Sequence, residues 1–193
     1  DNPQHSYTVK LLNSIPGKKA ELNLENEQLL TGRKVDIKYP ITKNIFGKTV
    51  DFLNAVKKVD ITIHSGSTTG LVGESGSGKS SLARALLGIE KAEGNIVFDG
   101  RNIHQLNSSE TRRFKKDFQI VFQDPFGSLS PRMTIGEIVG EGLRVHEPSL
   151  IRSEREKKII KALEDVELDK SSFSRFPHEL SGGQRQRVAI GRA

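Results

Sequence analysis

The 193-residue sequence contains no cysteine, which excludes disulfides, thiolate zinc sites and cysteine nucleophiles. It also lacks any apolar run near the roughly 20 residues that a membrane-spanning helix needs. The first residues show no basic segment followed by an apolar stretch, so a signal peptide is not expected within them. Apolar residues make up only 34% of the chain, a low share for a compact domain, so part of it is expected to be linker.

Positive charge, by contrast, is plentiful. The formal net charge is +6, and lysine and arginine occur in short clusters. The clusters are Lys57-Lys58, Arg112-Arg113 with Lys115-Lys116, and Arg155 with Lys157-Lys158. Such clusters are typical of solvated helix faces, and they also fit attraction to an anionic surface such as nucleic acid or inner-leaflet lipid. Phe114 alone stands within these clusters, so they show no repeated pattern of interleaved aromatics, and nucleic acid is not expected as a partner.

Alternating and short apolar runs predict the strands. Val35, Ile37 and Tyr39 alternate with polar residues, as in a half-buried strand. The other predicted strands are an alternating run over 55–63, an apolar run over 68–72, the run 95–98 before the turn Asp99-Gly100, and a buried run over 118–122. Residues from about 16 to 32 show no sustained periodicity and are typical of a linker.

Helices are expected between and after these strands, where apolar residues recur at helical spacing. The first begins near Gly78, with Leu82, Leu86 and Leu87 facing inward, and the second begins at Ser108. A third spans 135–143, and a fourth has Ile159, Ile160, Leu163 and Val166 on one face. The last runs from about Gly183 to the end of the chain. Early strands followed by alternating strands and helices predict an α/β domain with a β-rich front.

The strongest motif is a glycine-rich loop between a predicted strand and a predicted helix, the context that this motif requires. Its residues, Gly73, Glu74, Ser75, Gly76, Ser77, Gly78, Lys79 and Ser80, fit the pattern G-x-x-x-x-G-K-[ST]. Glycines let backbone N–H groups wrap a phosphate, and the helix N-terminus adds unpaired donors. Lys79 is expected to reach the β- and γ-phosphates, and the Ser80 hydroxyl to ligate Mg²⁺. A glycine-rich turn with an incidental lysine would match in about one chain in a hundred of this length, so the loop predicts nucleoside triphosphate binding.

A second motif, Leu180-Ser181-Gly182-Gly183-Gln184, lies about a hundred residues later. Locally it is a serine N-cap with a glycine pair opening a helix, and the donors at Ser181, Gly183 and Gln184 suit an anion. Paired with the phosphate loop, it resembles the signature of the nucleotide-binding domains of ABC ATPases. The resemblance covers nearly the whole chain from Lys34 onward. It implies the α/β fold of a P-loop NTPase of ABC type, with a β-rich front subdomain and a helical subdomain that carries the signature.

The resemblance also implies roles for single residues. Gln123 looks like the glutamine of the Q-loop, which reaches the Mg²⁺ region, assists there and contacts the membrane partner. Tyr39 resembles the aromatic that stacks on adenine, with Phe52 as its rival, and Ser81 resembles a second hydroxyl on the α-phosphate. In the family, residues equivalent to 181–184 bind an ATP held by the phosphate loop of a second ATP-binding domain, in a head-to-tail pair.

Two segments narrow the subfamily. FQDPFGSLSPRMTIGEIVGEGL and RFPHELSGGQRQRVAIGRA resemble ATPases of the oligopeptide, dipeptide and microcin C importers. This implies ATP-driven import of peptides or peptide-like compounds through transmembrane permease subunits, at the cytoplasmic face of the inner membrane. The alternative is an ABC ATPase of DNA repair or translation, although the lack of cysteine argues against the zinc-bearing repair type. The solute itself is not predicted, because the ATPase never contacts it.

The organisation of the chain follows from the same resemblance. Residues 1–16, with HSYTVKLLNSIPG, resemble the tail that closes an ATPase domain of this group, 17–33 form a linker, and 34–193 form an ATP-binding domain. Its parts are 34–122 for the front and core, 123–180 for the Q-loop and helical subdomain, and 181–193 for the signature helix. In the family, a Walker B aspartate, a catalytic glutamate, a D-loop and a switch histidine follow. The chain is therefore expected to be most of the second half of a tandem fused ATPase, truncated before Walker B, that binds Mg-ATP with little turnover.

Overall fold

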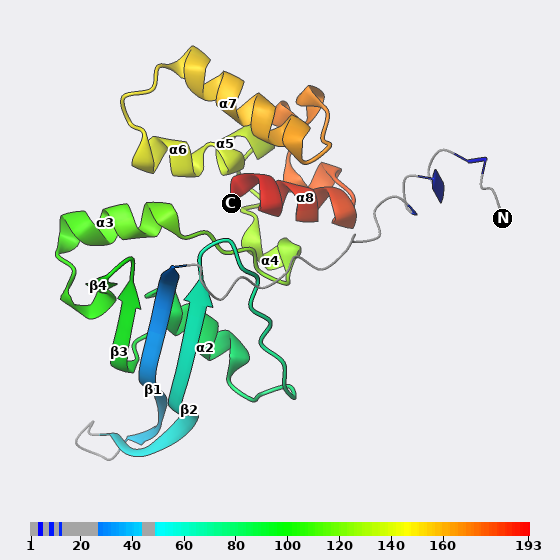
Figure 1. Ribbon diagram of the computed structural model, residues 1–193. Coiled ribbons are helices and arrows are strands. Elements are labelled where there is room, and N and C mark those ends of the chain that lie inside the picture. Colours follow the sequence, from blue (N-terminus) through cyan, green and yellow to red (C-terminus); the bar gives the residue numbers. More distant parts are fainter. Residues whose placement is uncertain (1–3, 6–7, 10–11, 13–26, 44–48) are drawn as a thin grey trace. The chain divides into compact units, whose positions relative to one another are not determined.

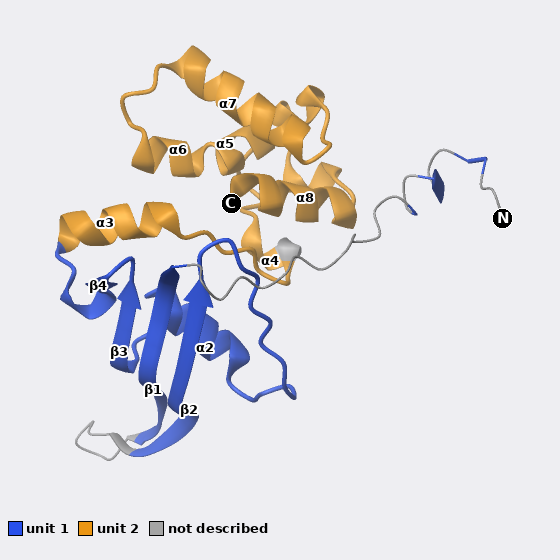
Figure 2. Cartoon of the chain, viewed as in Figure 1, with its two compact units in different colours: residues 1–107 blue, residues 108–193 orange. Residues whose placement is uncertain are grey.

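The computed structural model describes residues 4–5, 8–9, 12, 27–43 and 49–193. The chain divides into two compact units, residues 1–107 and residues 108–193 (Figure 2). Each unit is described by itself. In the described ranges, no helix is both long and apolar enough to cross a membrane. Most of the predicted tail and most of the predicted linker lie outside these ranges.

The first unit is built on an antiparallel sheet with the strand order β2-β1-β3-β4 (Figure 1). The strands are β1 (Gln28–Lys43), β2 (Thr49–His64), β3 (Glu93–Phe98) and β4 (Arg101–Asn102), and a 3₁₀ turn (Ile103–Gln105) follows β4. Val35, Ile37 and Ile96 are fully buried, as the alternating pattern predicts. Asp99 and Gly100 both have positive φ, +46° and +72°, which is the backbone of a tight hairpin turn. The alternating runs predicted as strands are thereby confirmed.

Strand β1 begins at Gln28, inside the stretch predicted to be linker. Its register with β2 shifts between Gly32 and Val35, and Lys34 has a left-handed φ of +49°. This bulge interrupts the alternation of apolar and polar residues, which hides the first part of the strand from pattern reading. The predicted end of the linker at residue 33 therefore falls within a continuous strand.

Helix α2 (Lys79–Leu86) packs against β1 and β2. Its predicted start is confirmed, since Gly78 is the N-cap residue. Leu82 and Leu86 are buried as predicted, whereas Leu87, just past the last turn, is half-buried. The apolar face of the helix thus fixes its N-terminus against the sheet.

Two predicted strands do not form. Residues 68–72 and 118–122 belong to no strand in the described part of the chain. Val72 is 97% exposed, and Val121 and Phe122 are also exposed. Both runs have the composition of a strand buried between neighbours, but a strand exists only where partner strands take its hydrogen bonds. The sheet β2-β1-β3-β4 includes neither run, so the prediction of a strand over 68–72 and of a buried strand over 118–122 is wrong.

The second unit is helical (Figure 1). Its elements are α3 (Ser108–Asp117), α4 (Pro125–Ser128), α5 (Ile135–Val139), α6 (Glu141–His146), α7 (Arg152–Asp165) and α8 (Gly182–Arg192), with 3₁₀ turns at Lys170–Ser174 and Pro177–Glu179. Its core gathers apolar side chains of α5, α7 and α8, among which Ile135 and Val188 are fully buried. The single helix predicted over 135–143 is divided at Gly140. A Cβ on Gly140 would lie 2.6 Å from Ile159 Cδ1, so glycine lets α7 approach closely there.

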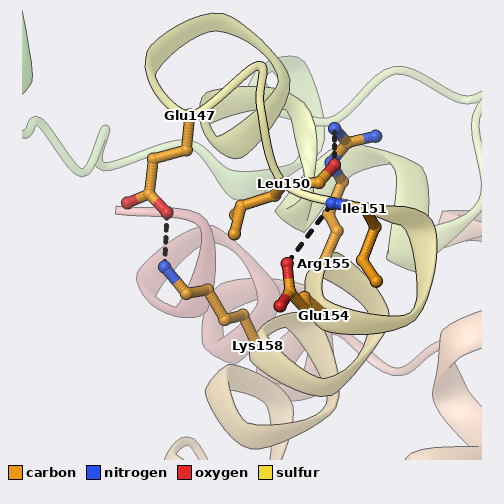
Figure 3. Close-up of polar contacts among 6 residues, drawn as sticks. All are labelled: Glu147, Leu150, Ile151, Glu154, Arg155 and Lys158. Carbon is orange, nitrogen blue, oxygen red and sulfur yellow. Dashed lines mark hydrogen bonds and ion pairs between the residues drawn. The ribbon is translucent and has the colours of Figure 1, made fainter.

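Polar contacts hold the start of α7 (Figure 3). Arg155 Nη2 donates to a backbone carbonyl just before the helix at 3.0 Å, and the Ile151 N–H donates to Glu154 Oε2 at 3.4 Å. Glu147, before the helix, forms an ion pair with Lys158 within it. Because Ile151 has no side-chain acceptor, this helix start depends on these contacts rather than on a capping side chain.

Candidate phosphate-binding site

The glycine-rich loop of the first unit runs directly into α2. Within it, the Ser77 N–H donates to the Glu74 carbonyl oxygen at 3.2 Å and closes a turn. Gly76 and Gly78 have left-handed φ values of +80° and +88°. Gly78 lies against β2, where an added Cβ would be 2.3 Å from the carbonyl oxygen of Ala55. Only glycine fits this position, because any side chain would meet both the backbone strain and the overlap.

The N-terminus of α2 has no side-chain cap. Its N-cap residue is Gly78, which offers no acceptor to the first turn. The first N–H groups of the helix therefore have no intrahelical partner, and the helix dipole adds partial positive charge at the same end. This end of α2 is suited to receive an anion.

The Lys79 ammonium group lies over the backbone of the loop. Its Nζ donates to the carbonyl oxygens of Gly73 at 2.8 Å and Glu74 at 2.6 Å, with Ser77 Oγ at 3.4 Å. An ammonium group has three donor hydrogens, so oxygens of the loop itself can occupy all of them. Phosphate oxygens would replace neutral acceptors with charged ones, and such charge-assisted bonds are about twice as strong. Lys79 is thus placed to turn from its own loop to a phosphate.

Tyr39 and Ser81 join β1 to the same helix start. Tyr39 Oη donates to Ser81 Oγ at 3.1 Å, between residues 42 positions apart. Both side chains are half-buried. Phe52, the rival of Tyr39, is 48% exposed and lines a separate depression together with Asp36 and Lys38. Of the two aromatic residues, Tyr39 is the one bonded to the predicted site.

The predicted magnesium ligands belong to different units. Ser80, on the first turn of α2, is exposed in the first unit, and Gln123 is exposed in the second. Among the described residues, no group of three or more His, Asp and Glu side chains is placed to hold a metal ion by itself. A hydroxyl, a side-chain amide and phosphate oxygens are oxygen ligands of the kind that Mg²⁺ accepts, so the donor types fit. The joint site stays a prediction.

Residues 181–184 form the start of α8 in the second unit. Ser181 is the N-cap residue: its Oγ accepts from the Gln184 N–H at 3.3 Å, and Gln184 Oε1 accepts from the Ser181 N–H at 2.9 Å. Of the groups predicted to bind an anion, this reciprocal capping box occupies the Gln184 N–H, whereas the Ser181 hydroxyl accepts and keeps its hydrogen. Gly182 and Gly183 are exposed, and a Cβ on Gly183 would meet nothing within 4 Å. The surface above Gly183 is open, whereas the donor at Gln184 is already engaged.

Sequence reasoning predicted the serine N-cap at Ser181, which is confirmed, but missed the hydrogen bonds of Tyr39 and Lys79 and the glutamine half of the capping box. The bond from Tyr39 to Ser81 joins residues too far apart in sequence for any pattern to link them. The bonds from Lys79 to the loop carbonyls depend on the loop conformation. The capping box, by contrast, has a readable pattern, a serine followed three residues later by a glutamine.

Comparisons with known proteins identify the family of the chain. Residues 56–193 match the sequence model of a family described as ABC transporter. The chain is 44% identical over 193 residues to the peptidoglycan transport ATP-binding protein YejF of Agrobacterium fabrum. The alignment covers 100% of this chain and 35% of that protein. It is 42% identical over 160 residues to the oligopeptide transport ATP-binding protein OppF of Haemophilus influenzae, with 82% of this chain and 48% of that protein covered. The chain thus spans between a third and a half of the length of these relatives.

The similar solved structures are also ATP-binding cassettes of this family. The chain resembles the ATP-binding cassette MJ0796, solved as a dimer in a post-hydrolysis state bound to ADP and Pi. The TM-score is 0.72 and the sequence identity 29%, over 85% of this chain and 68% of that one.

Proposed function

Since the chain belongs to the ABC transporter family and has the α/β P-loop fold of its ATP-binding cassettes, we propose that it binds Mg-ATP at residues 73–81. The observation that carries this proposal is the Lys79 ammonium group, bonded to two carbonyls of the loop beside the uncapped N-terminus of α2. A mobile cation and unpaired N–H groups on one short piece of backbone suit the β- and γ-phosphates. The ADP and Pi in the similar cassette MJ0796 support the same class of ligand here.

The remaining residues of the site take the roles that the family resemblance implies. Mg²⁺ would be held by the Ser80 hydroxyl and phosphate oxygens, with Gln123 assisting, and would neutralise charge on the phosphates. The Tyr39 ring would lie beside the adenine, and Ser81 beside the α-phosphate.

The process that we propose for the parent protein is import of peptides or peptide-like compounds. The names of several relatives support this, among them OppF of Haemophilus influenzae and a putative peptide import ATP-binding protein of Brucella ovis, 49% identical over 142 residues. None of these names favours DNA repair or translation. In this role the domain binds transmembrane permease subunits and associates peripherally with the cytoplasmic face of the inner membrane.

A second ATP-binding domain, fused in the parent chain, is the other proposed partner. The alignment with YejF of Agrobacterium fabrum includes all 193 residues, and so also those before β1. The two domains would pair head to tail, with residues 181–184 serving the ATP bound by the other domain. The open surface above Gly183 supports an approach from outside its own unit.

By itself, the 193-residue chain is proposed to bind Mg-ATP with little turnover. Phosphoryl transfer needs a group that holds the second side of Mg²⁺ and one that orients the attacking water. The loop supplies Lys79 and Ser80. In the family, the aspartate and the glutamate that supply the other two groups come after the signature. Phosphate release that scales with the concentration of the chain, and that disappears in Lys79→Ala, would contradict this proposal.

Titration calorimetry with Mg-ATP tests the loop itself. Lys79→Ala should weaken binding about tenfold or more, because hydrogen bonds to charged groups are each worth about 1.5–3 kcal/mol. The matched control is Lys157→Ala, which removes an exposed lysine of α7 and should bind as the wild type does. Equal affinities for the wild type and Lys79→Ala would overturn the assignment.

A further inference from the structure

The hydrogen bond between Tyr39 and Ser81 lies where β1 meets the start of α2. Ser81 is on the first turn of α2, and helical side chains tilt back toward the helix N-terminus. Its hydroxyl is therefore directed toward the uncapped end, where the loop would hold a phosphate chain. Tyr39 reaches the same hydroxyl from β1, with 3.1 Å between the two oxygens.

An anionic ligand would set the direction of this bond between two hydroxyls. A hydroxyl has one hydrogen to donate and two lone pairs that accept. A phosphate oxygen can only accept, so beside Ser81 it would take the serine hydrogen and leave Tyr39 Oη, 3.1 Å from Ser81 Oγ, to donate to that oxygen. Hydrogen bonds in a chain polarise one another, so the Tyr39 donor also makes Ser81 a stronger donor. A phenylalanine ring could contact the same helix but could supply neither effect.

We propose that Tyr39 is a positioning residue, whose hydroxyl orients and polarises the Ser81 O–H toward the phosphate chain of the bound nucleotide. This rests on the proposed function of the loop, and it gives Tyr39 a role that does not involve the base. Because the role belongs to the hydroxyl and not to the ring, it persists with a phosphate ligand that has no base.

Titration calorimetry on the full 193-residue chain tests this with two ligands, Mg-ATP and magnesium tripolyphosphate, which has the phosphates without the base. Tyr39→Phe should weaken the binding of both ligands by about 2- to 10-fold, the worth of one hydrogen bond. In the Ser81→Ala background, Tyr39→Phe should have no further effect, because no hydroxyl is left to position.

Ser81→Thr is the conservative control. It keeps a hydroxyl, so Tyr39→Phe should weaken binding of both ligands in this background by the same factor as in the wild type. The melting temperature of each variant, measured without ligand, shows whether the fold is retained. A bond that serves only the packing of β1 on α2 would lower the melting temperature of Tyr39→Phe and leave both affinities unchanged.

Two results would overturn the proposal. One is wild-type affinity of Tyr39→Phe for both ligands, which would leave the loop as an ATP site but give the hydroxyl no role. The other is an equal loss of affinity from Tyr39→Phe with and without the Ser81 side chain, which would show that the effect does not pass through Ser81. Failure of the wild type to bind either ligand would instead overturn the proposed function of the loop.

Discussion

Two helices of this chain begin at glycine-containing motifs, and their N-termini differ in capping: one has no side-chain cap and the other has a capping box. Helix α2 follows Gly78, which has no side-chain acceptor, while α8 follows Ser181, which forms a capping box with Gln184. The first end leaves its N–H groups for a ligand, and the second satisfies part of its own. The uncapped start of α2 supports the proposal that the loop binds its phosphate within its own unit. The capped start of α8 supports the proposal that residues 181–184 serve a ligand held by another domain.

The glycines of the two motifs differ in the same sense. Gly78 has a φ of +88°, and a side chain there would overlap the backbone of β2. Gly183 lies in a helix, and a Cβ on it would meet nothing within 4 Å. Folding of its own unit requires Gly78, whereas no described neighbour within the chain requires Gly183.

The largest expected effect is that of Gly78→Ala. It should reduce the free energy of unfolding by about 3 kcal/mol, because a left-handed backbone costs about 1–2 kcal/mol and overlap adds a similar amount. The matched control is Gly76→Ala, where φ is +80° but the added Cβ lies in open space, so a loss of about 1 kcal/mol is expected. Chemical denaturation followed by circular dichroism measures both. Equal losses would show that the contact with Ala55 contributes nothing.

Ser181→Ala tests the capped helix start. It should destabilise α8 by about 1 kcal/mol, the usual cost of losing an N-cap hydroxyl. Hydrogen exchange of the Gln184 amide is the local readout, since that N–H loses its acceptor. Ser153→Ala, at an exposed position of α7, is the control and should leave this amide unchanged. Unaltered protection at Gln184 in Ser181→Ala would mean that the capping box does not hold this end.

Gly183→Ala should act in the opposite direction. Alanine in a helix is more favourable than glycine by about 0.8–1 kcal/mol, and the open space above Gly183 accepts a methyl group. The variant should therefore melt at a slightly higher temperature than the wild type. Gly191→Ala on the same helix is the comparison, because its Cβ would lie 3.3 Å from the Ala162 carbonyl oxygen and should cancel part of the gain. A lower melting temperature for Gly183→Ala would reveal a constraint on the signature from within its own unit.

The smallest effect concerns the start of α7. Its N-cap residue, Ile151, has no side-chain acceptor, and side-chain contacts such as the Glu147–Lys158 ion pair hold it instead. The hydrogen bond from Lys158 lowers the pKa of Glu147; desolvation opposes it, and the charges of Lys158 and Lys116 add to it. A carboxyl group with a lowered pKa stabilises the folded chain above its unfolded pKa, and this contribution is lost as the pH falls through the folded pKa. The window thus lies below the ordinary glutamate value of about 4.3.

Lys158→Gln checks this ion pair. It should return the pKa of Glu147 toward its ordinary value, which an NMR titration of the side-chain carboxyl measures. Lys157→Gln, one position earlier on α7, removes the same charge without the bond and should leave the titration close to that of the wild type. An unchanged pKa in Lys158→Gln would show that the pair seen in Figure 3 does not persist in solution.

The elements that the sequence predicts well are those set by neighbouring residues. The start of α2 depends on Gly78, and the start of α8 on Ser181, each within a few positions of the helix that it opens. The runs 68–72 and 118–122 were misread because the partners of a strand are distant in sequence, and composition does not name them. The first part of β1 was missed because the bulge around Lys34 breaks the alternation. The contact of Tyr39 with Ser81 depends on how β1 packs on α2, which no local pattern contains.

The bonds from Lys79 to its own loop have a consequence for the entropy of binding. Fixing the backbone of one residue costs about 1–2 kcal/mol, and a loop rich in glycine has much freedom to lose. Lys79 ties the end of the loop to its beginning at Gly73 and Glu74, so folding has already ordered this backbone. A loop preorganised in this way does not lose that freedom again when the ligand arrives. At the proposed site, nucleotide binding would then exchange the partners of Lys79 on a loop backbone that is already ordered.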